Sequence, residues 1–376
     1  MPKIVSVIGA RPQFIKFASV SRAIKKFNQR RIRKNLKFKE IVLHTGQHYD
    51  YNMNDIFFKE LTLKNPDYYL GVGSCPAAKQ VALMLEGIGR VLKKEAPDLV
   101  LVFGDTNSTL AGALAAKKNN ILLAHVEAGL RSYNMNMPEE LNRVVTDRIS
   151  DILFCPSKNA IKNLALEGIK NYSAKKSPRV FLVGDVMYDT ILFFMEIAEE
   201  RSSILEELLL MPKSYYLVTV HRAENTDDRA CLKSILEGIS DVARNSAPVI
   251  FPIHPRTRRV MKQVGFKYPC DMLRIIEPVS YLDMLILEKN ARAILTDSGG
   301  VQKEAYFLKV PCITLRNETE WTETVELGCN TLTGFDKGRI KKALEKREKL
   351  NGSYPKVYGD GRAGEKVINI LASLMN

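Results

Sequence analysis

The stretch ILTDSGGVQKEA, residues 294–305, decides the fold class of this chain. A short apolar run ends at Asp297, two glycines follow, and VQKEAYFL has the composition of a helix start. The next apolar run, VPCITLR (310–316), is typical of another strand, so the region predicts one strand–turn–helix–strand unit of a parallel sheet. The letters DSGG also occur around the nucleophile of chymotrypsin-type proteases. Those domains are all-β, so the surrounding pattern argues against Ser298 as a nucleophile.

The same alternation of apolar strands and helical patterns runs through all 376 residues. Six strand candidates lie between IVSVIGA (4–10) and RVFLVGD (179–185), and five more lie between YYLVTVH (215–221) and PCITLR. Strands that are apolar throughout predict parallel sheets covered by helices on both faces. We therefore expect an α/β protein with two doubly wound domains. The predicted domains are residues 1–184 with a returning C-terminal helix in 355–376, and residues 185–354.

The composition is that of an ordinary globular protein, with 45% hydrophobic and 26% charged residues. No apolar run approaches the ~18 residues of a membrane helix, and the first apolar stretch is too short for a secretory signal. We expect a cytoplasmic protein without membrane insertion. The six cysteines form no C-x-x-C pair, which favours buried thiols over disulfides or a zinc site.

The net charge of +14 is concentrated in residues 25–39, KKFNQRRIRKNLKFK, which hold eight basic residues and no acid. This run could be a nucleic-acid patch or the solvated end of a helix with its loop. No RNA-binding motif, helix-turn-helix or aromatic platform accompanies it, so the second interpretation is favoured and no nucleic-acid partner is predicted. A basic cleft for an acidic metabolite is also compatible with the charge.

All five histidines fall at the predicted carboxyl ends of strands, where open α/β sheets bind their ligands. They are His44, His48, His125, His221 and His254. One such histidine is most simply structural, whereas five together indicate a site. Their spacing is not that of metal ligands, so no metal is predicted. The chain also lacks the glycine motifs of NAD-binding folds and of P-loops.

The basic and glycine-rich strand ends point to an anionic ligand. Arg11 and Lys16 open the first predicted helix. A helix that begins at a glycine turn presents main-chain N–H groups to an anion. That turn comprises Ser298, Gly299 and Gly300. Glu304 is well placed for sugar hydroxyls, or is a solvated residue near the helix start.

Carboxylates form a second group. Asp105 and Glu127 end neighbouring predicted strands, while Glu139 and Glu140 open a helix after Pro138. For Glu140, favourable charge at a helix start is the preferred explanation. Asp105 and Glu127 could be helix caps, but two acids at adjacent strand ends suit paired proton transfer.

Taken in order, these segments resemble the non-hydrolysing UDP-N-acetylglucosamine 2-epimerase family. The resemblance covers nearly the whole chain: GARPQFIK, TGQH, GDTNSTLAGALAA, HVEAGLRS, MPEELNR, HRAEN, HPRT, and TDSGGVQKEA followed by a TE-x-x-E-T-V segment. It implies the two-domain, Rossmann-like glycosyltransferase-B architecture with an active site in the interdomain cleft. It also implies a cofactor-independent isomerase that feeds cell-surface polysaccharide, and a homodimer.

The resemblance implies roles for matching residues. UDP is held through its diphosphate by Arg11, His221, Ser298, Gly299 and Gly300, and through its ribose by Glu304. The sugar side is lined by Lys16, Asp105, Glu127, Glu139 and Arg143. Of these, Asp105, Glu127 and Glu139 are the acid and base candidates, and His221 assists the leaving group.

The chain departs from the family at Trp321, where many members have the arginine of T-E-R-P-E. Together with GARPQFIK, GDVM, HRAENTDD and DSGGVQKEA, this is similar to the branch acting on UDP-2,3-diacetamido-2,3-dideoxy-glucuronic acid. Bacterial members can bind a second UDP-sugar near Gln47 and His48. Both residues are present, but LGVGSCPAA (70–78) has no arginine, which leaves that regulation open.

Three alternatives to the epimerase remain at this stage. A UDP-sugar glycosyltransferase would have the same fold but would need an acceptor. A hydrolysing relative would release free N-acetylmannosamine and UDP. A basic nucleic-acid-binding protein would depend on residues 25–39 and on low salt. The sequence does not determine which UDP-sugar is used.

Overall fold

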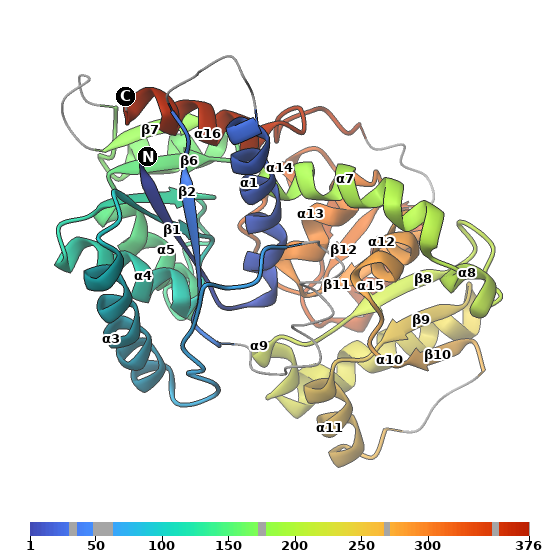
Figure 1. Ribbon diagram of the computed structural model, residues 1–376. Helices are drawn as coiled ribbons and strands as arrows, with labels where there is room; N and C mark the ends of the chain where they lie inside the picture. The colour runs from blue at the N-terminus through green and yellow to red at the C-terminus, as the bar shows by residue number, and fades with distance from the viewer. Residues whose placement is uncertain (30–35, 48–62, 172–177, 267–270, 348–352, 376) are drawn as a thin grey trace. The chain divides into compact units, whose positions relative to one another are not determined.

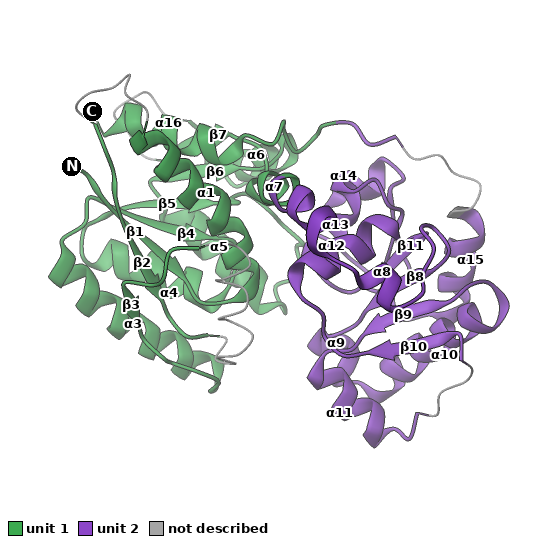
Figure 2. Ribbon diagram, turned by 45° about the vertical axis from the view of Figure 1, so that its right-hand side comes forward, with its two compact units in different colours: residues 1–192, 356–376 green, residues 193–355 purple. Residues whose placement is uncertain are grey.

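We analysed a computed structural model of the chain. It describes residues 1–29, 36–47, 63–171, 178–266, 271–347 and 353–375. The chain divides into two compact units, residues 1–192 with 356–376 (unit 1) and residues 193–355 (unit 2), coloured separately in Figure 2. Each unit is described by itself.

Unit 1 contains a parallel sheet of seven strands in the order β3-β2-β1-β4-β5-β6-β7 (Figure 1). The strands are β1 (Lys3–Ile8), β2 (Lys39–His44), β3 (Tyr68–Tyr69), β4 (Leu99–Phe103), β5 (Leu122–Val126), β6 (Ile152–Cys155) and β7 (Arg179–Leu182). The order reverses between β1 and β4. Such a reversal, or switch point, opens a crevice beyond the carboxyl ends of the two strands, where doubly wound sheets bind ligands.

Helices cover both faces of this sheet. They are α1 (Arg11–Gln29), α3 (Ala77–Glu95), α4 (Asn107–Lys118), α5 (Pro138–Ile149), α6 (Lys158–Leu166) and α16 (Ala363–Leu374). Helix α7 (Val186–Arg201) begins in unit 1 and continues into unit 2. Val5 and Val7 of β1 pack with α3 and α4 in one apolar cluster. The C-terminal helix α16 packs against α1 (Figure 1). Asp189 of α7 fixes the start of α16, because it accepts the N–H groups of Ala363 and Gly364 at 3.0 and 2.8 Å.

Unit 2 contains a parallel sheet of six strands in the order β10-β9-β8-β11-β12-β13, with its switch point between β8 and β11. The strands are β8 (Tyr216–Thr219), β9 (Val249–Pro252), β10 (Leu273–Ile276), β11 (Ala293–Thr296), β12 (Cys312–Thr314) and β13 (Asn330–Leu332). The helices are α8 (Ile204–Glu207), α9 (Ala223–Thr226), α10 (Arg229–Asn245), α11 (Pro255–Gln263), α12 (Tyr281–Asn290), α13 (Gly299–Phe307), α14 (Thr322–Glu326) and α15 (Lys337–Arg347). Apolar residues of α10 and α15 pack on β8, β9 and β11 to form the core.

The predicted α/β class with two doubly wound sheets is confirmed, and every strand candidate is a strand. The two edge strands β3 and β13 were not predicted, because two or three residues are too few for a recognisable apolar run. One long helix was expected after residue 189. It is divided into α7 and α8 at Ser202 and Ser203.

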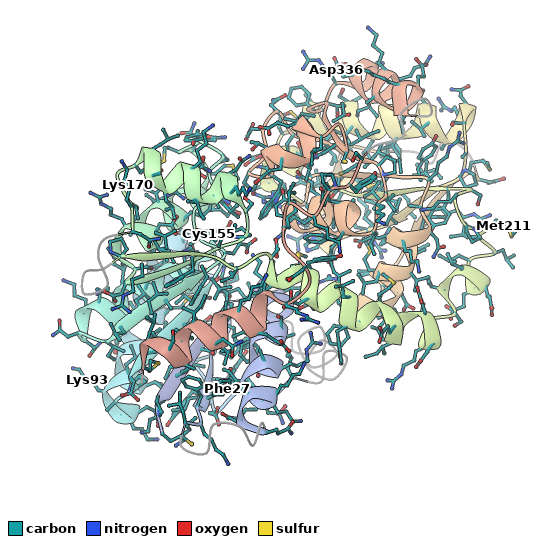
Figure 3. All side chains as sticks on the ribbon, turned by 90° about the horizontal axis from the view of Figure 1, so that it is seen from above. Phe27, Lys93, Cys155, Lys170, Met211 and Asp336 are labelled. Atoms are coloured by element: carbon teal, nitrogen blue, oxygen red, sulfur yellow. The ribbon has the colours of Figure 1, made fainter. Side chains whose placement is uncertain are left out.

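The basic run 25–39 begins in the last turns of α1 and ends at the start of β2, while residues 30–35 lie outside the described ranges. Lys93 and Lys170 of unit 1, and Met211 and Asp336 of unit 2, extend into solvent (Figure 3). Cys155 lies in the interior of unit 1, where burial raises the pKa of its thiol. None of the helices in the described ranges combines the length and apolar composition that a membrane span requires.

Candidate active site

The switch point of unit 1 is fastened by one buried amide. Gln13 of α1 accepts the N–H of Ala10 at 3.1 Å, directly after β1. Its Nε2 donates to the carbonyl of Phe103 and to Oγ1 of Thr109, both at 3.1 Å, at the end of β4 and the start of α4. Gln13 therefore ties the two strand ends together. Sequence analysis did not single it out.

Lys16 and Glu127 form a buried ion pair at this edge of the sheet. Lys16 projects from α1, and Glu127 follows β5 with a positive φ of 74°. A Cβ atom on Gly104, after β4, would lie 2.7 Å from Lys16 Nζ and 3.3 Å from Glu127 Oε2. Any other residue at 104 would have to displace the end of the Lys16 side chain, and the positive φ of 61° also favours glycine there.

Arg143 of α5 joins Asp105 to a second carboxylate. Its NH1 donates to Asp105 Oδ2 at 2.8 Å, and its NH2 donates to Glu140 Oε2 at 2.7 Å. Arg143 and Glu140 are fully buried, whereas the Asp105 side chain is 25% exposed. Of the three side chains, only Asp105 thus reaches solvent. The buried guanidinium of Arg143 holds its carboxylate in place.

Glu140 has a larger role than favourable charge at a helix start. Its carboxylate accepts the N–H groups of Ser132 and Tyr133, each at 2.9 Å, besides pairing with Arg143. Burial acts to raise the pKa of Glu140, but these hydrogen bonds and the guanidinium outweigh it and hold the pKa below its ordinary value. The neighbouring Glu139 is half-buried in the first turn of α5.

The two described histidines of unit 1, His44 and His125, are both buried. His44 is buried between the rings of Phe14 and Tyr69, with centroid distances of 5.2 and 5.0 Å, and its Nδ1 accepts the N–H of Gly46. His125 is completely buried within β5. His48 lies outside the described residues. Gln47 accepts the N–H and Oγ–H of Ser108 at 3.0 and 2.7 Å, so it caps α4.

The switch point of unit 2 is built on a buried carboxylate, Asp297, directly after β11. Its oxygens accept the N–H groups of His221 and Arg222 at 3.0 and 2.9 Å and an amide N–H of Asn225 at 3.1 Å. Nδ1 of His221 lies 3.3 Å from Asp297 Oδ1, and the His221 side chain is 39% exposed. Asp297 therefore orients an imidazole that can still reach a ligand. Asp297 is not among the residues predicted from the sequence.

The glycine turn begins α13 as predicted. Ser298 is its N-cap, with Oγ accepting the Val301 N–H at 3.4 Å. Gly299 and Gly300 are the first helical residues, whose N–H groups have no partner within the helix. Helix starts of this kind bind phosphate. Glu304 is 5% exposed, so the alternative of a solvated residue is wrong.

Trp321 lies directly beside this turn. A Cβ atom on Gly299 would be 3.4 Å from the indole Nε1 and 3.3 Å from an oxygen of Glu320. The indole is 3% exposed, and Nζ of Lys303 lies 4.1 Å from its ring centroid. Trp321, the residue that departs from the family pattern, thus packs against the turn that is predicted to bind the diphosphate.

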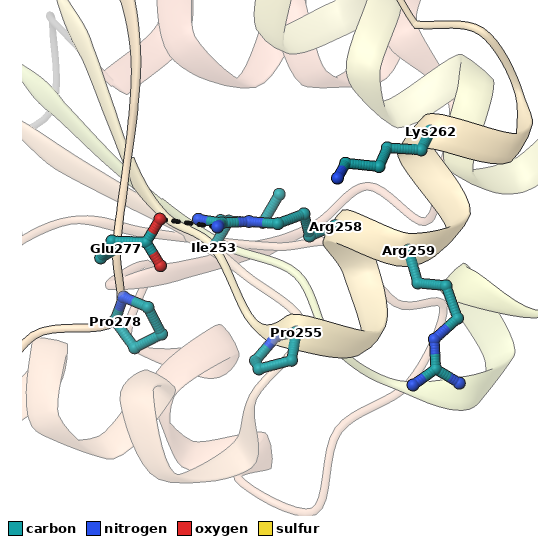
Figure 4. Close-up of a pocket in the computed structure, with 7 residues that line it drawn as sticks. All are labelled: Ile253, Pro255, Arg258, Arg259, Lys262, Glu277 and Pro278. Atoms are coloured by element: carbon teal, nitrogen blue, oxygen red, sulfur yellow. Dashed lines mark ion pairs between the residues drawn. The ribbon is translucent and has the colours of Figure 1, made fainter.

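A cavity of about 320 Å³ opens on the same edge of the unit 2 sheet, after β9 and β10 (Figure 4). Its lining residues are Ile253, Pro255, Arg258, Arg259, Lys262, Glu277 and Pro278. Arg258 and Glu277 form an ion pair at 2.6 Å across it, and Arg259 and Lys262 add positive charge. The ring of His254 lies beside that of His221 at 5.7 Å. Within the described ranges, no group of three or more metal-ligating side chains is present.

Comparison with known proteins agrees with this geometry. Residues 30–372 match the model of the family described as UDP-N-acetylglucosamine 2-epimerase. Over 99% of its length the chain is 49% identical to a UDP-N-acetylglucosamine 2-epimerase homolog of Methanococcus maripaludis, and 45% identical to UDP-2,3-diacetamido-2,3-dideoxy-D-glucuronate 2-epimerase of Pseudomonas aeruginosa, covering 100% of each. The crystal structure of Methanocaldococcus jannaschii UDP-GlcNAc 2-epimerase in complex with UDP-GlcNAc and UDP is 44% identical, with 99% of both chains covered and a TM-score of 0.90. The chain belongs to the UDP-N-acetylglucosamine 2-epimerase family.

Proposed function

We propose that the protein is an isomerase that inverts C2 of a UDP-2-acetamido sugar, in the manner of UDP-N-acetylglucosamine to UDP-N-acetylmannosamine, without a cofactor. The observation that carries this proposal is the pair of carboxylates at the unit 1 switch point. Asp105 and Glu127 are each held by a buried cation, Arg143 and Lys16. Family membership supports the reaction class, and this geometry supports Asp105 and Glu127 as acid and base candidates.

The reaction has to proceed by elimination, because the C2 hydrogen of an N-acetylhexosamine has no adjacent carbonyl to stabilise a carbanion. A carboxylate takes the C2 proton while the C1–O bond breaks and UDP leaves with the electron pair, which forms a glycal. UDP then adds back to C1 as a proton is delivered to the opposite face of C2. A group that can accept or donate a proton is therefore needed on each face of the sugar ring.

We assign the proton transfers to Asp105, Glu127 and Glu139. Arg143 holds Asp105 in place, and Lys16 holds Glu127. The departing diphosphate is stabilised by Arg11, by His221 and by the N–H groups of residues 298–300. Fixed donors aimed at developing charge are typically worth about 10²–10³ in rate. Asp297 supports this role by orienting His221 at 3.3 Å. Glu304 is assigned to the ribose.

The alternative substrate is UDP-2,3-diacetamido-2,3-dideoxy-glucuronic acid, on which the Pseudomonas relative acts. Trp321 favours this alternative, because an indole stands where many family members have an arginine. Parallel assays with the two UDP-sugars decide between them, with the larger kcat/KM identifying the substrate class.

The central test is incubation with either UDP-sugar alone in D₂O, followed by NMR and mass spectrometry. We expect one deuterium at C2 of both epimers and no net release of UDP. Absence of exchange with both UDP-sugars would contradict the proposal. Release of free sugar and UDP would identify a hydrolase, and turnover only with an added acceptor would identify a glycosyltransferase. The interdomain cleft, the domain boundaries, the homodimer, the second UDP-sugar site at Gln47 and His48, and the cytoplasmic location stay predictions.

A further inference from the structure

His125 connects the two strand ends that carry Asp105 and Glu127. Its Nε2 lies 2.7 Å from the carbonyl oxygen of Gly104, to which it donates, and its Nδ1 lies 2.8 Å from Oδ1 of Asp147. The imidazole is completely buried and Asp147 is 1% exposed, so neither side chain contacts a substrate. Both ring nitrogens are engaged in holding other groups in place.

The contacts of this pair flank both catalytic candidates. Gly104 immediately precedes Asp105, and its carbonyl is fixed by His125. Glu127 is two residues from His125 and two residues from Gly129, whose N–H donates to Oδ2 of Asp147 at 3.0 Å. One histidine–aspartate pair therefore fixes the β4–α4 turn through a carbonyl and the segment after β5 through an N–H group.

Arg131 holds the Asp147 side of this pair in place. Its NH1 donates to Asp147 Oδ2 at 2.7 Å, while its Nε and NH2 donate to the carboxylate of Glu167 at 2.6 and 2.8 Å. Burial acts to raise the pKa of Asp147, but the contacts with His125 and Arg131 prevail and keep the pKa below its ordinary value. Arg131 thus keeps Asp147, the carboxylate that His125 contacts, charged and fixed.

We propose that His125 and Asp147 are positioning residues that set the separation between the Asp105 and Glu127 carboxylates. The inference rests on the proposed epimerase function. Reacting groups displaced by ~1 Å can lose ~10²-fold in rate, so a change in this spacing appears in kcat. It is expected to leave UDP affinity intact, because neither His125 nor Asp147 is among the residues that we assign to UDP.

Two substitutions separate the two contacts of the ring. His125→Gln places an amide N–H where Nε2 was and retains the bond to the Gly104 carbonyl. His125→Asn places its amide N–H where Nδ1 was and retains the bond to Asp147. If the Gly104 contact positions Asp105, kcat falls ~100-fold in His125→Asn but within ~10-fold in His125→Gln. KM and UDP affinity, measured by calorimetry, are expected to change by less than about 3-fold in both.

Thermal melts of both variants show whether a loss of kcat follows loss of folding. Should His125→Asn fail to fold, Asp147→Asn serves in its place, because its amide has nearly the same shape, and an expected ~10-fold fall in kcat at unchanged KM is the readout. Equal kcat in the Gln and Asn variants, or unchanged kcat in Asp147→Asn, would overturn the inference. Wild-type protein is assayed alongside. If it gives no C2 exchange, the proposed function fails instead.

Discussion

The two switch points of this molecule have the same topology and opposite construction. In unit 1 the switch point is built from charged side chains, with Lys16 against Glu127 and Arg143 between Asp105 and Glu140. In unit 2 it is built from the main-chain N–H groups of residues 298–300 and from His221 on Asp297. One site is made of buried ion pairs, and the other is made of backbone.

This difference matches the different tasks that we propose for them. Removing one partner of a buried ion pair costs about 3–5 kcal/mol, because the other charge is left uncompensated, so the unit 1 geometry is rigid and intolerant of charge loss. Main-chain N–H groups are removed only by substitution with proline, and a helix start presents them to a phosphate in any protonation state of the side chains. The buried ion pairs of unit 1 suit proton transfer, and the main-chain N–H groups of unit 2 suit a diphosphate that leaves and returns.

The largest expected effect separates chemistry from binding. Glu127→Gln keeps the size of the side chain but removes one of the carboxylates to which we assign proton transfer, so the rate of C2 exchange is expected to fall by ~10³-fold. UDP affinity should stay within about 2-fold, since Glu127 is not among the residues that we assign to UDP. Single-turnover exchange in D₂O and calorimetric titration with UDP measure the two quantities.

The matched control in the other unit is His221→Asn, which should weaken UDP binding and lower the rate together, by about 10-fold to 100-fold. If Glu127→Gln weakens UDP binding as much as His221→Asn does, the division of labour between the two sites is wrong. Thermal melts of both variants exclude a loss caused by unfolding.

A smaller effect is expected from adding one methyl group to each glycine turn. Gly104→Ala has a positive φ of 61° to accommodate and a Cβ contact of 2.7 Å with Lys16 Nζ, so we expect a loss of about 1–3 kcal/mol in unfolding free energy. Gly299→Ala meets Glu320 and Trp321 at 3.3 and 3.4 Å, which requires only a small shift. It should cost less than about 1 kcal/mol.

Denaturant unfolding of the two alanine variants tests this difference, and UDP titration provides a second readout. Gly299→Ala should change UDP affinity more than it changes stability, because the methyl group alters the turn that we propose binds the diphosphate. Equal destabilisation by the two substitutions would show that the ion pair does not depend on the glycine at 104.

Much of both sites could be predicted from the sequence, because their residues follow apolar runs. Asp105 and Glu127 were found as acids directly after predicted strands, and Ser298 was found through the glycine turn that follows it. The edge strands β3 and β13 could not be predicted, since their pairing partners and not their own two or three residues make them strands.

The supporting residues could not be predicted, because their roles depend on partners far along the chain. Gln13 contacts residues 90 and 96 positions away, and Asp297 contacts residues 72 to 76 positions away. Glu139 and Glu140 are adjacent in sequence and equivalent in helix-start chemistry. Only the fold shows that Glu140 is buried against Arg143 while Glu139 is half-buried.

The smallest expected effect tests whether the charges of unit 1 stabilise its fold. The pKa of Glu140 is lowered in the folded protein, so its stabilising contribution is present above the ordinary carboxyl pKa of about 4.3 and is lost as pH falls through the lowered value. Glu140→Gln lacks this dependence. The wild type should melt above the variant at pH 7, and the difference should narrow by a few degrees between pH 5 and pH 3.

Glu326→Gln, in unit 2, is the control for general acid effects, and its melting difference from the wild type should stay constant over the same range. A Glu140→Gln difference that is also constant would mean that the carboxylate contributes to unit 1 through its shape and hydrogen bonds and not through its charge. In that case Arg143 would serve to orient Asp105 and not to stabilise the fold, and the contrast with the site of unit 2 would concern reactivity and not stability.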